Sequence, residues 1–164
     1  MLEGWRKWEG SVTLPMYVSK ALAEFSIGRI HLARGDTKAA KEAYARALLE
    51  DLSFPMAHAD LAEVLLADGD SAAALLEYET AVQLRQSDPV FHYRYGALLL
   101  RRGRNTDAIR EFEAAIRSEP LFALPYLPLA YMEELSGSDS AAVQRYDAFL
   151  QRASRDQSNL IDFA

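Results

Sequence analysis

Hydrophobic residues recur at helical spacing along most of the chain, in short segments separated by polar turns. Ile27 and Ile30 share one helical face, as do Leu61, Val64 and Leu65. A glycine follows each such segment, and glycine ends a helix readily because it adopts the left-handed backbone conformation without steric cost. A second amphipathic segment begins after each glycine. The pattern therefore predicts a series of helix–turn–helix pairs.

These pairs repeat every 34 residues. Five columns of similar residues keep this spacing: Gly35, Gly69, Gly103 and Gly137; Ala40, Ala74, Ala108 and Ala142; the rings Tyr44, Tyr78, Phe112 and Tyr146; Ala47, Ala81 and Ala115, with Phe149 breaking the series; and the small residues Gly28, Ala62, Gly96 and Ala130. Small residues on both helices let a pair approach closely, and the ring fills the space beside them. One pair cannot bury its apolar faces alone, so neighbouring pairs are expected to stack.

The columns resemble the tetratricopeptide repeat, which implies an all-α fold, a right-handed α-solenoid of four helix–turn–helix repeats. We place the repeats at 21–54, 55–88, 89–122 and 123–156, after a non-repeat N-terminal segment or cap at 1–20 and before a short tail at 157–164. In the fourth repeat Pro125 and Pro128 interrupt the first helix, which we expect to begin late, near Pro125.

Both ends of such a stack leave an apolar flank. Trp5 and Trp8, three residues apart, either pack on the first repeat, anchor a partner or lie in a disordered segment. The tail either folds over the last helix or enters a neighbouring molecule. We therefore expect a larger parent chain or a homodimer through the exposed terminal repeats. The residues of this second candidate interface are Trp5, Trp8, Tyr146, Phe149, Leu150 and Phe163.

The resemblance also implies an inner groove, lined by the first helix of each repeat. Carrying the family's groove positions over to this chain gives a mainly apolar and aromatic set with charges of both signs: Phe25, Arg29, Leu32, Met56, Asp60, Glu63, Leu66, Val90, Tyr93, Arg94, Leu100, Arg101, Leu124, Leu127, Tyr131 and Glu134. The carboxylate clamp of some family members needs Lys and Asn at fixed positions. Only Arg94 fits that pattern, so a chaperone-tail clamp is not expected.

Two interpretations of the groove charges remain open. In the first, Arg29 pairs with Asp60, and Glu63 pairs with Arg94. Exposed pairs of this kind contribute at most about 1 kcal/mol, so they would tune solubility more than stability. In the second, Arg94 and Arg101 bind an acidic group of a ligand. The residues that would then hold its apolar side chains are Phe25, Tyr93, Leu127 and Tyr131.

No constellation of catalytic residues is evident. His58 and His92 occupy the same repeat position and His31 takes the position of a core aromatic, so all three are interpreted as packing residues and no metal site is expected. A glycine-rich phosphate loop and the GxSxG and HExxH motifs are absent from the sequence. We therefore expect a protein that is not an enzyme and has no cofactor.

Composition narrows the class of partner. The net charge of −6 argues against a nucleic-acid ligand, and no apolar stretch is long enough for a membrane span. The chain has no cysteine, which excludes disulfides and thiolate metal sites. We expect a soluble protein of the cytoplasm, with the periplasm as the alternative for a chain from which a signal peptide has been removed.

These features favour a protein–protein interaction module that binds a peptide or helix of a partner in the groove through apolar and aromatic anchors. A dedicated chaperone or assembly factor for one client is the alternative, including the type that resembles secretion-translocator chaperones. A non-catalytic subunit of an enzyme complex is the third class. The fold alone does not choose among them, because it hosts many unrelated binders.

Overall fold

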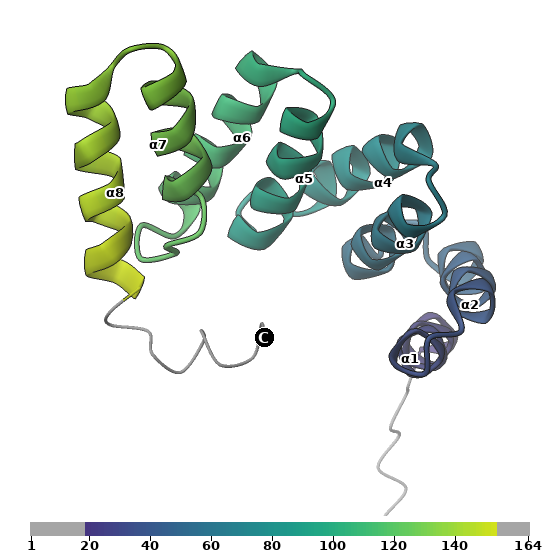
Figure 1. Cartoon of the computed structure of the whole chain (residues 1–164). Coiled ribbons are helices and arrows are strands. Elements are labelled where there is room, and N and C mark those ends of the chain that lie inside the picture. The colour runs from purple at the N-terminus through teal and green to yellow at the C-terminus, as the bar shows by residue number, and fades with distance from the viewer. Residues whose placement is uncertain (1–18, 154–164) are drawn as a thin grey trace, which may run out of the picture. The chain divides into compact units, whose positions relative to one another are not determined.

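The computed structural model describes residues 19–153, and every regular element within them is an α-helix (Figure 1). In chain order the helices are α1 (Lys20–Ala33), α2 (Thr37–Glu50), α3 (Pro55–Ala67), α4 (Ser71–Leu84), α5 (Pro89–Arg101), α6 (Asn105–Ser118), α7 (Tyr126–Leu135) and α8 (Asp139–Ala153). The all-α prediction is therefore confirmed over this range. The predictions for Trp5, Trp8 and Phe163 lie outside the described residues.

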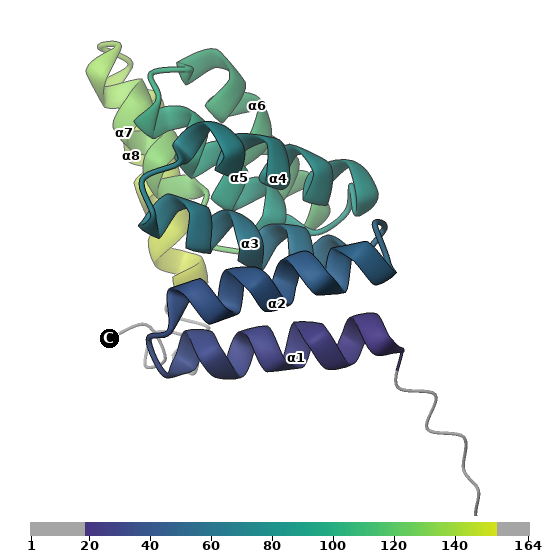
Figure 2. The ribbon, with the colours of Figure 1, turned by 90° about the vertical axis from the view of Figure 1, so that its right-hand side faces the viewer.

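The chain divides into two compact units, Met1–Leu52 and Ser53–Ala164. In the first unit α1 and α2 lie side by side and run in opposite directions (Figure 2). In the second unit α3 pairs with α4, α5 with α6, and α7 with α8, while α5 and α7 also pack on the helix that precedes each of them. The helix–turn–helix pair is thus the unit of construction throughout.

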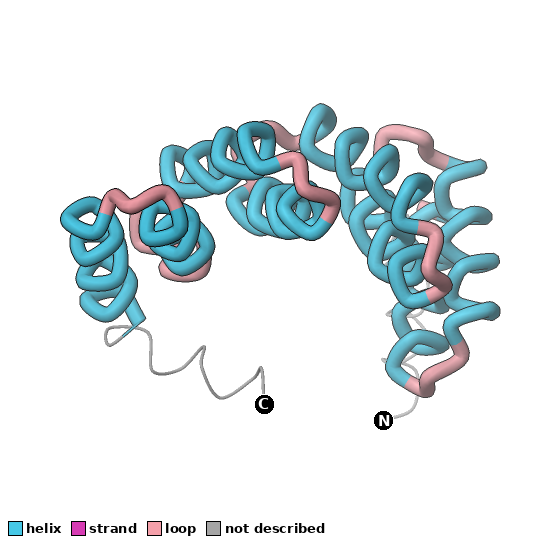
Figure 3. The backbone as a smooth tube through the Cα atoms, turned by 45° about the horizontal axis from the view of Figure 1, so that its top comes forward, coloured by secondary structure: helices cyan, strands magenta, loops and turns pink. Residues whose placement is uncertain are grey.

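The turn within each pair depends on a glycine. Gly35, Gly69, Gly103 and Gly137 are the residues described with positive φ, at 77°, 84°, 73° and 77°. A side chain is strained in this left-handed region, whereas glycine enters it freely. Figure 3 shows short loops at these turns between the helices of each pair. The prediction that one glycine column caps equivalent turns is confirmed.

Aspartate and proline begin several of the helices. Asp36 and Asp70 each accept a hydrogen bond from a backbone N–H three residues ahead at 3.0 Å, which caps α2 and α4. Pro55 and Pro89 occupy the first positions of α3 and α5, where the missing N–H costs little because it would have no helical partner. Cap and turn residues therefore fix where each helix starts and stops.

Close contact between a glycine and a ring holds the first and third pairs together. A Cβ atom added at Gly28 would lie 2.5 Å from Cε1 of Tyr44, and one at Gly96 would lie 2.9 Å from Cε1 of Phe112. Both rings are fully buried. The first helix thus presses its backbone against the ring of the second, which explains why the two columns occur together in the sequence.

The last pair departs from this pattern. As predicted, α7 begins late, at Tyr126 directly after Pro125, and it has 10 residues where α3 and α5 have 13. The ring of Tyr146, the counterpart of Phe112, is only half-buried, and its hydroxyl donates to Glu134 at 3.0 Å. In addition, α7 packs less extensively on α6 than α5 does on α4.

The small-residue columns predict the effect of overpacking. Ala108 is fully buried in α6, so Ala108→Leu should lower the free energy of unfolding by about 1–3 kcal/mol, measured by urea denaturation. The matched control is Ala72→Leu at an exposed position of α4. Equal stability of the two variants would mean that the register of the columns is wrong.

Candidate functional site

The predicted groove residues of the C-terminal unit keep accessible surface on or just before α3, α5 and α7. Those that are exposed or half-buried are Met56, Asp60, Glu63, Leu66, Val90, Tyr93, Arg94, Leu100, Arg101, Leu124, Leu127, Tyr131 and Glu134. Several of these side chains are large and apolar, and one of them, Tyr131, is 54% exposed. A folded unit that leaves so many apolar side chains partly open on its first helices has a surface suited to a partner.

Of the three groove candidates in the N-terminal unit, two are exposed and one is buried. Arg29 and Leu32 are exposed on α1. Phe25, however, is only 3% exposed and its ring centre lies 5.7 Å from that of Tyr44. Its side chain therefore belongs to the core between α1 and α2 and has almost no surface left for a ligand.

A cavity of about 450 Å³ opens at the junction of the last two helix pairs. Its apolar wall is formed by Leu100, Ile109, Leu129, Tyr131, Met132 and Leu135. Two of these, Leu100 and Tyr131, are predicted groove residues. The cavity lies beside the shortened α7, which packs less extensively on α6 than α5 does on α4. Its size and lining suit one or two large apolar side chains of a partner.

A carboxylate lies in the wall of this cavity. Glu133 occupies the repeat position of the buried Leu65 and Leu99, and its Oε1 accepts a hydrogen bond from Nε of Arg145 at 3.2 Å. Its Oε2 is buried and accepts no hydrogen bond from the residues described. Sequence reasoning missed Glu133, although a charged residue in a column that carries leucine in the two preceding repeats was a usable signal.

Tyr93 is partly a core residue. Its ring centre lies 6.0 Å from that of Phe112 and 5.7 Å from that of Phe122, the latter in an edge-to-face arrangement. Burial raises the pKa of the Tyr93 hydroxyl. Removing this ring would therefore disturb packing as well as any bound ligand, so Tyr93→Ala does not isolate a binding role.

One of the two predicted groove ion pairs is confirmed. Nη1 of Arg94 lies 3.7 Å from Oε1 of Glu63, which also accepts a short hydrogen bond from Tyr78. Burial, and after it the bond to Glu63, raises the pKa of Tyr78. At this distance and with both partners well exposed, the ion pair is weak. The Arg29–Asp60 pair would join the two units and stays a prediction.

Arg101, unlike Arg94, is a groove cation that remains available to a ligand. Its neighbours in the sequence are engaged, since Arg102 donates to Ser71 Oγ at 2.9 Å and Arg104 pairs with Asp107 at 2.7 Å. Arg101 is exposed and forms no ion pair with residues 19–153. Of the two arginines predicted to bind an acidic group, Arg101 is therefore the freer one.

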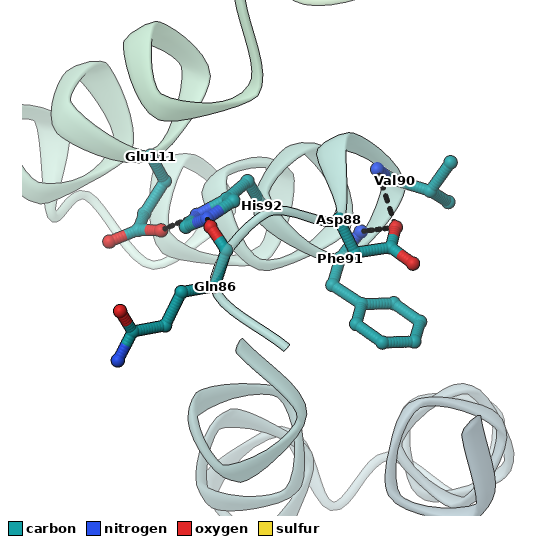
Figure 4. A network of polar contacts seen from close by, with 6 residues as sticks. All are labelled: Gln86, Asp88, Val90, Phe91, His92 and Glu111. Carbon is teal, nitrogen blue, oxygen red and sulfur yellow. Dashed lines mark hydrogen bonds and ion pairs between the residues drawn. The ribbon is translucent and has the colours of Figure 1, made fainter. Parts of the chain in front are cut away.

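The histidines form structural pairs. Nδ1 of His58 lies 2.6 Å from Glu77, and Nδ1 of His92 lies 2.7 Å from Glu111. Figure 4 shows His92 held between Glu111 and the carbonyl oxygen of Gln86, to which its Nε2 lies at 2.8 Å. Both histidines are buried, as their repeat position predicted. The two glutamates, also 34 residues apart, went unnoticed in the sequence.

His31 differs from this pair, because it is half-buried and its Nδ1 lies 3.8 Å from the Asp36 carboxylate. The aromatic core position assigned to it is thus only partly enclosed.

Within residues 19–153 no group of three or more His, Cys, Asp or Glu side chains could hold a metal ion. Among the same residues, no helix combines the length and hydropathy that crossing a membrane requires.

A profile described as "Tetratricopeptide repeat" matches residues 25–89 and 93–157, well over half of the chain. The chain belongs to the tetratricopeptide repeat (TPR) family. The recognition of this family from the sequence columns is confirmed, as is the helical repeat fold. No curated protein sequence matches this TPR protein at a significant level.

Solved structures of TPR proteins are similar to the chain. A crystal structure of MamA has a TM-score of 0.77 at 18% identity, covering 93% of this chain and 88% of that one. YrrB, whose structure is described as a TPR protein with an unusual peptide-binding site, has a TM-score of 0.70 at 20% identity, covering 87% and 74%. The second TPR of Spaghetti (RPAP3), bound to the HSP90 peptide SRMEEVD, has a TM-score of 0.58 at 23% identity, covering 62% and 94%.

The His92–Glu111 pair predicts a pH dependence of stability. The hydrogen bond to Glu111 raises the pKa of His92, against the opposing effects of burial and of Arg117. A raised pKa in the folded state means that the pair stabilises the fold fully below about pH 6.5, and that this contribution is lost as the pH rises through the folded pKa.

The measurement compares the free energy of unfolding at acidic and alkaline pH for the native chain and Glu111→Gln. From acidic to alkaline pH, the free energy of unfolding of the native chain should fall by about 1 kcal/mol more than that of the variant. Glu42→Gln, at an exposed position of α2, is the matched control and should behave like the native chain. Identical pH profiles for Glu111→Gln and the native chain would contradict the assigned role.

Proposed function

We propose that this TPR protein is a non-catalytic interaction module that binds an extended or helical segment of a partner protein along the first helices of its C-terminal unit. The observation that carries the proposal is the apolar cavity beside α7, whose wall includes Leu100 and Tyr131 from the expected groove. A cavity of this kind accepts side chains of a partner without any rearrangement of the fold.

Apolar contacts would supply most of the affinity. Fully burying one leucine-sized side chain contributes roughly 1.5–3 kcal/mol. Two or three such anchors, in the cavity and against Leu127, would give a complex in the micromolar range once the cost of association is subtracted. The weak ion pair between Glu63 and Arg94 would add little to this sum.

Charge would set the orientation of the segment. Arg101 is exposed and can bind a carboxylate of the partner, whereas Arg94 is already beside Glu63. Peptide binding is in keeping with the descriptions of YrrB and of the RPAP3 repeat. The chain lacks the Lys and Asn pattern of a carboxylate clamp, so a chaperone tail is not the proposed ligand.

Selection from a random peptide library against the 164-residue chain would provide defined ligands. For peptides obtained in this way, Tyr131→Ala and Leu127→Ala should each raise the Kd at least about tenfold, because each removes part of an apolar anchor. Both side chains are at least one-third exposed, so the melting temperature should hardly change. Isothermal titration calorimetry gives the Kd, and circular dichroism the melting temperature.

Leu76→Ala is the matched control, since Leu76 is 65% exposed on α4 and lies outside the expected groove. Its Kd should equal that of the native chain. Peptides that bind Tyr131→Ala and Leu127→Ala as tightly as the native chain would show that the partner uses another surface.

The role of Arg101 is tested by charge reversal. Arg101→Glu should lower the association rate of acidic peptides by about tenfold at low salt and flatten the dependence of that rate on salt concentration. Lys38→Glu makes the same change of charge on the exposed surface of α2 and serves as the control. Equal rates for the two variants in stopped-flow measurements would remove Arg101 from the site.

A further inference from the structure

The packing of α5 on α4 shows how one helix pair contacts the next. At one end of this junction Nη1 of Arg102 donates to Oγ of Ser71 at 2.9 Å. At the other end the guanidinium of Arg85 lies 6.0 Å from the centre of the Phe91 ring. The two contacts identify the faces of α4 and α5 that meet.

Each of these faces is a stripe at helical spacing. The stripe of α5 and its C-terminal end consists of Phe91, Tyr95, Leu98 and Arg102. The stripe of α4 contains Ser71, Leu75 and Val82. Phe91, Tyr95 and Leu98 are buried, and Leu75 and Val82 are half-buried. Covering these apolar side chains is what joins one helix pair to the next.

The last helix carries the α4 stripe again, but without a cover among the described residues. Its counterparts, 68 residues after those of α4, are Asp139, Val143 and Leu150. Val143 is 58% exposed and Leu150 is 61% exposed. Two large apolar side chains on one helical face are therefore left open in α8.

The first helix carries the α5 stripe, which residues 19–153 likewise leave open. Its counterparts, 68 residues before those of α5, are Ala23, Ile27, Ile30 and Arg34. Ile27 is 41% exposed and Ile30 is 52% exposed, while Tyr95 and Leu98 at the same positions of α5 are buried. The two ends of the chain thus present the two halves of a junction that the chain itself builds between α4 and α5.

We propose that α8 of one molecule binds α1 of a second copy of the chain, in the arrangement that α4 and α5 adopt within one molecule. The partner is a second copy because the chain offers both complementary stripes, one at each end. This head-to-tail interface uses a different surface from the groove, so it goes beyond the proposed partner binding and does not depend on it.

Charge supports the match. Arg34 and Asp139 occupy the positions of Arg102 and Ser71, so a hydrogen bond of the internal junction becomes an ion pair between the copies.

A head-to-tail contact leaves a free stripe at each end of the dimer. Such a heterologous interface adds further copies unless the rotation closes a ring. The mean mass of the chain in solution should therefore increase with concentration, either beyond the mass of a dimer or up to the mass of a closed ring. Sedimentation velocity from micromolar to millimolar concentration measures this.

Single-end variants test the interface. Ile30→Asp and Leu150→Asp should each weaken self-association at least about tenfold, because each places a charge in the apolar stripe. Leu76→Asp introduces the same charge at an exposed leucine outside both stripes and should associate like the native chain.

Mixing distinguishes head-to-tail from symmetric association. Ile30→Asp retains a native α8 and Leu150→Asp retains a native α1, so an equimolar mixture should form a 1:1 dimer that grows no further. Likewise Arg34→Glu should weaken self-association, because it places a carboxylate of one copy against Asp139 of the next, and mixing it with Asp139→Arg should restore association. Native mass spectrometry resolves these species.

Three results would overturn the proposal. The chain could remain monomeric at every concentration. The mixture of single-end variants could contain no dimer. Finally, Leu150→Asp could lower the melting temperature of the monomer far more than Leu76→Asp, which would mean that the α8 stripe is covered within the same molecule.

Discussion

The structure depends on the contact between the backbone of one helix and the ring of the next. At Gly28 and Gly96 there is no room for even a methyl group without moving Tyr44 or Phe112. This contact sets the distance between the helices of a pair and buries the ring at their centre. Pairs built alike can then stack, which in the C-terminal unit leaves the first helices with open apolar side chains.

Much of the fold was predictable because it is written in periodic columns. Gly69 and Gly103 end helices through a backbone preference that is local, so the sequence alone reveals them. The partners Glu77 and Glu111 were harder to find, since the histidines that they bind lie on another helix. The burial of Phe25 against Tyr44 likewise depends on how two helices meet, which a family's groove positions do not specify.

The candidate site lies where the pattern weakens. Pro125 delays α7, the shortened helix packs loosely, and a cavity opens that no single residue encodes. Glu133 then replaces the core leucine of the two preceding pairs and binds Arg145, which itself stands where those two pairs carry glutamate. Functional positions often depart from the sequence pattern that would best stabilise the fold, because binding needs accessible surface that a more stable fold would bury.

Glycine is needed in the turn column and at Gly28 for different physical reasons, so the two positions should tolerate different substitutions. At Gly69 an added Cβ meets nothing within 4 Å, so only the left-handed backbone restricts that site. Asparagine, which tolerates this conformation, could replace glycine there at small cost. At Gly28 the backbone is helical and the neighbouring ring excludes volume instead. Drift should therefore admit asparagine in the turn column, whereas Gly28 should tolerate no side chain unless the ring of Tyr44 moves.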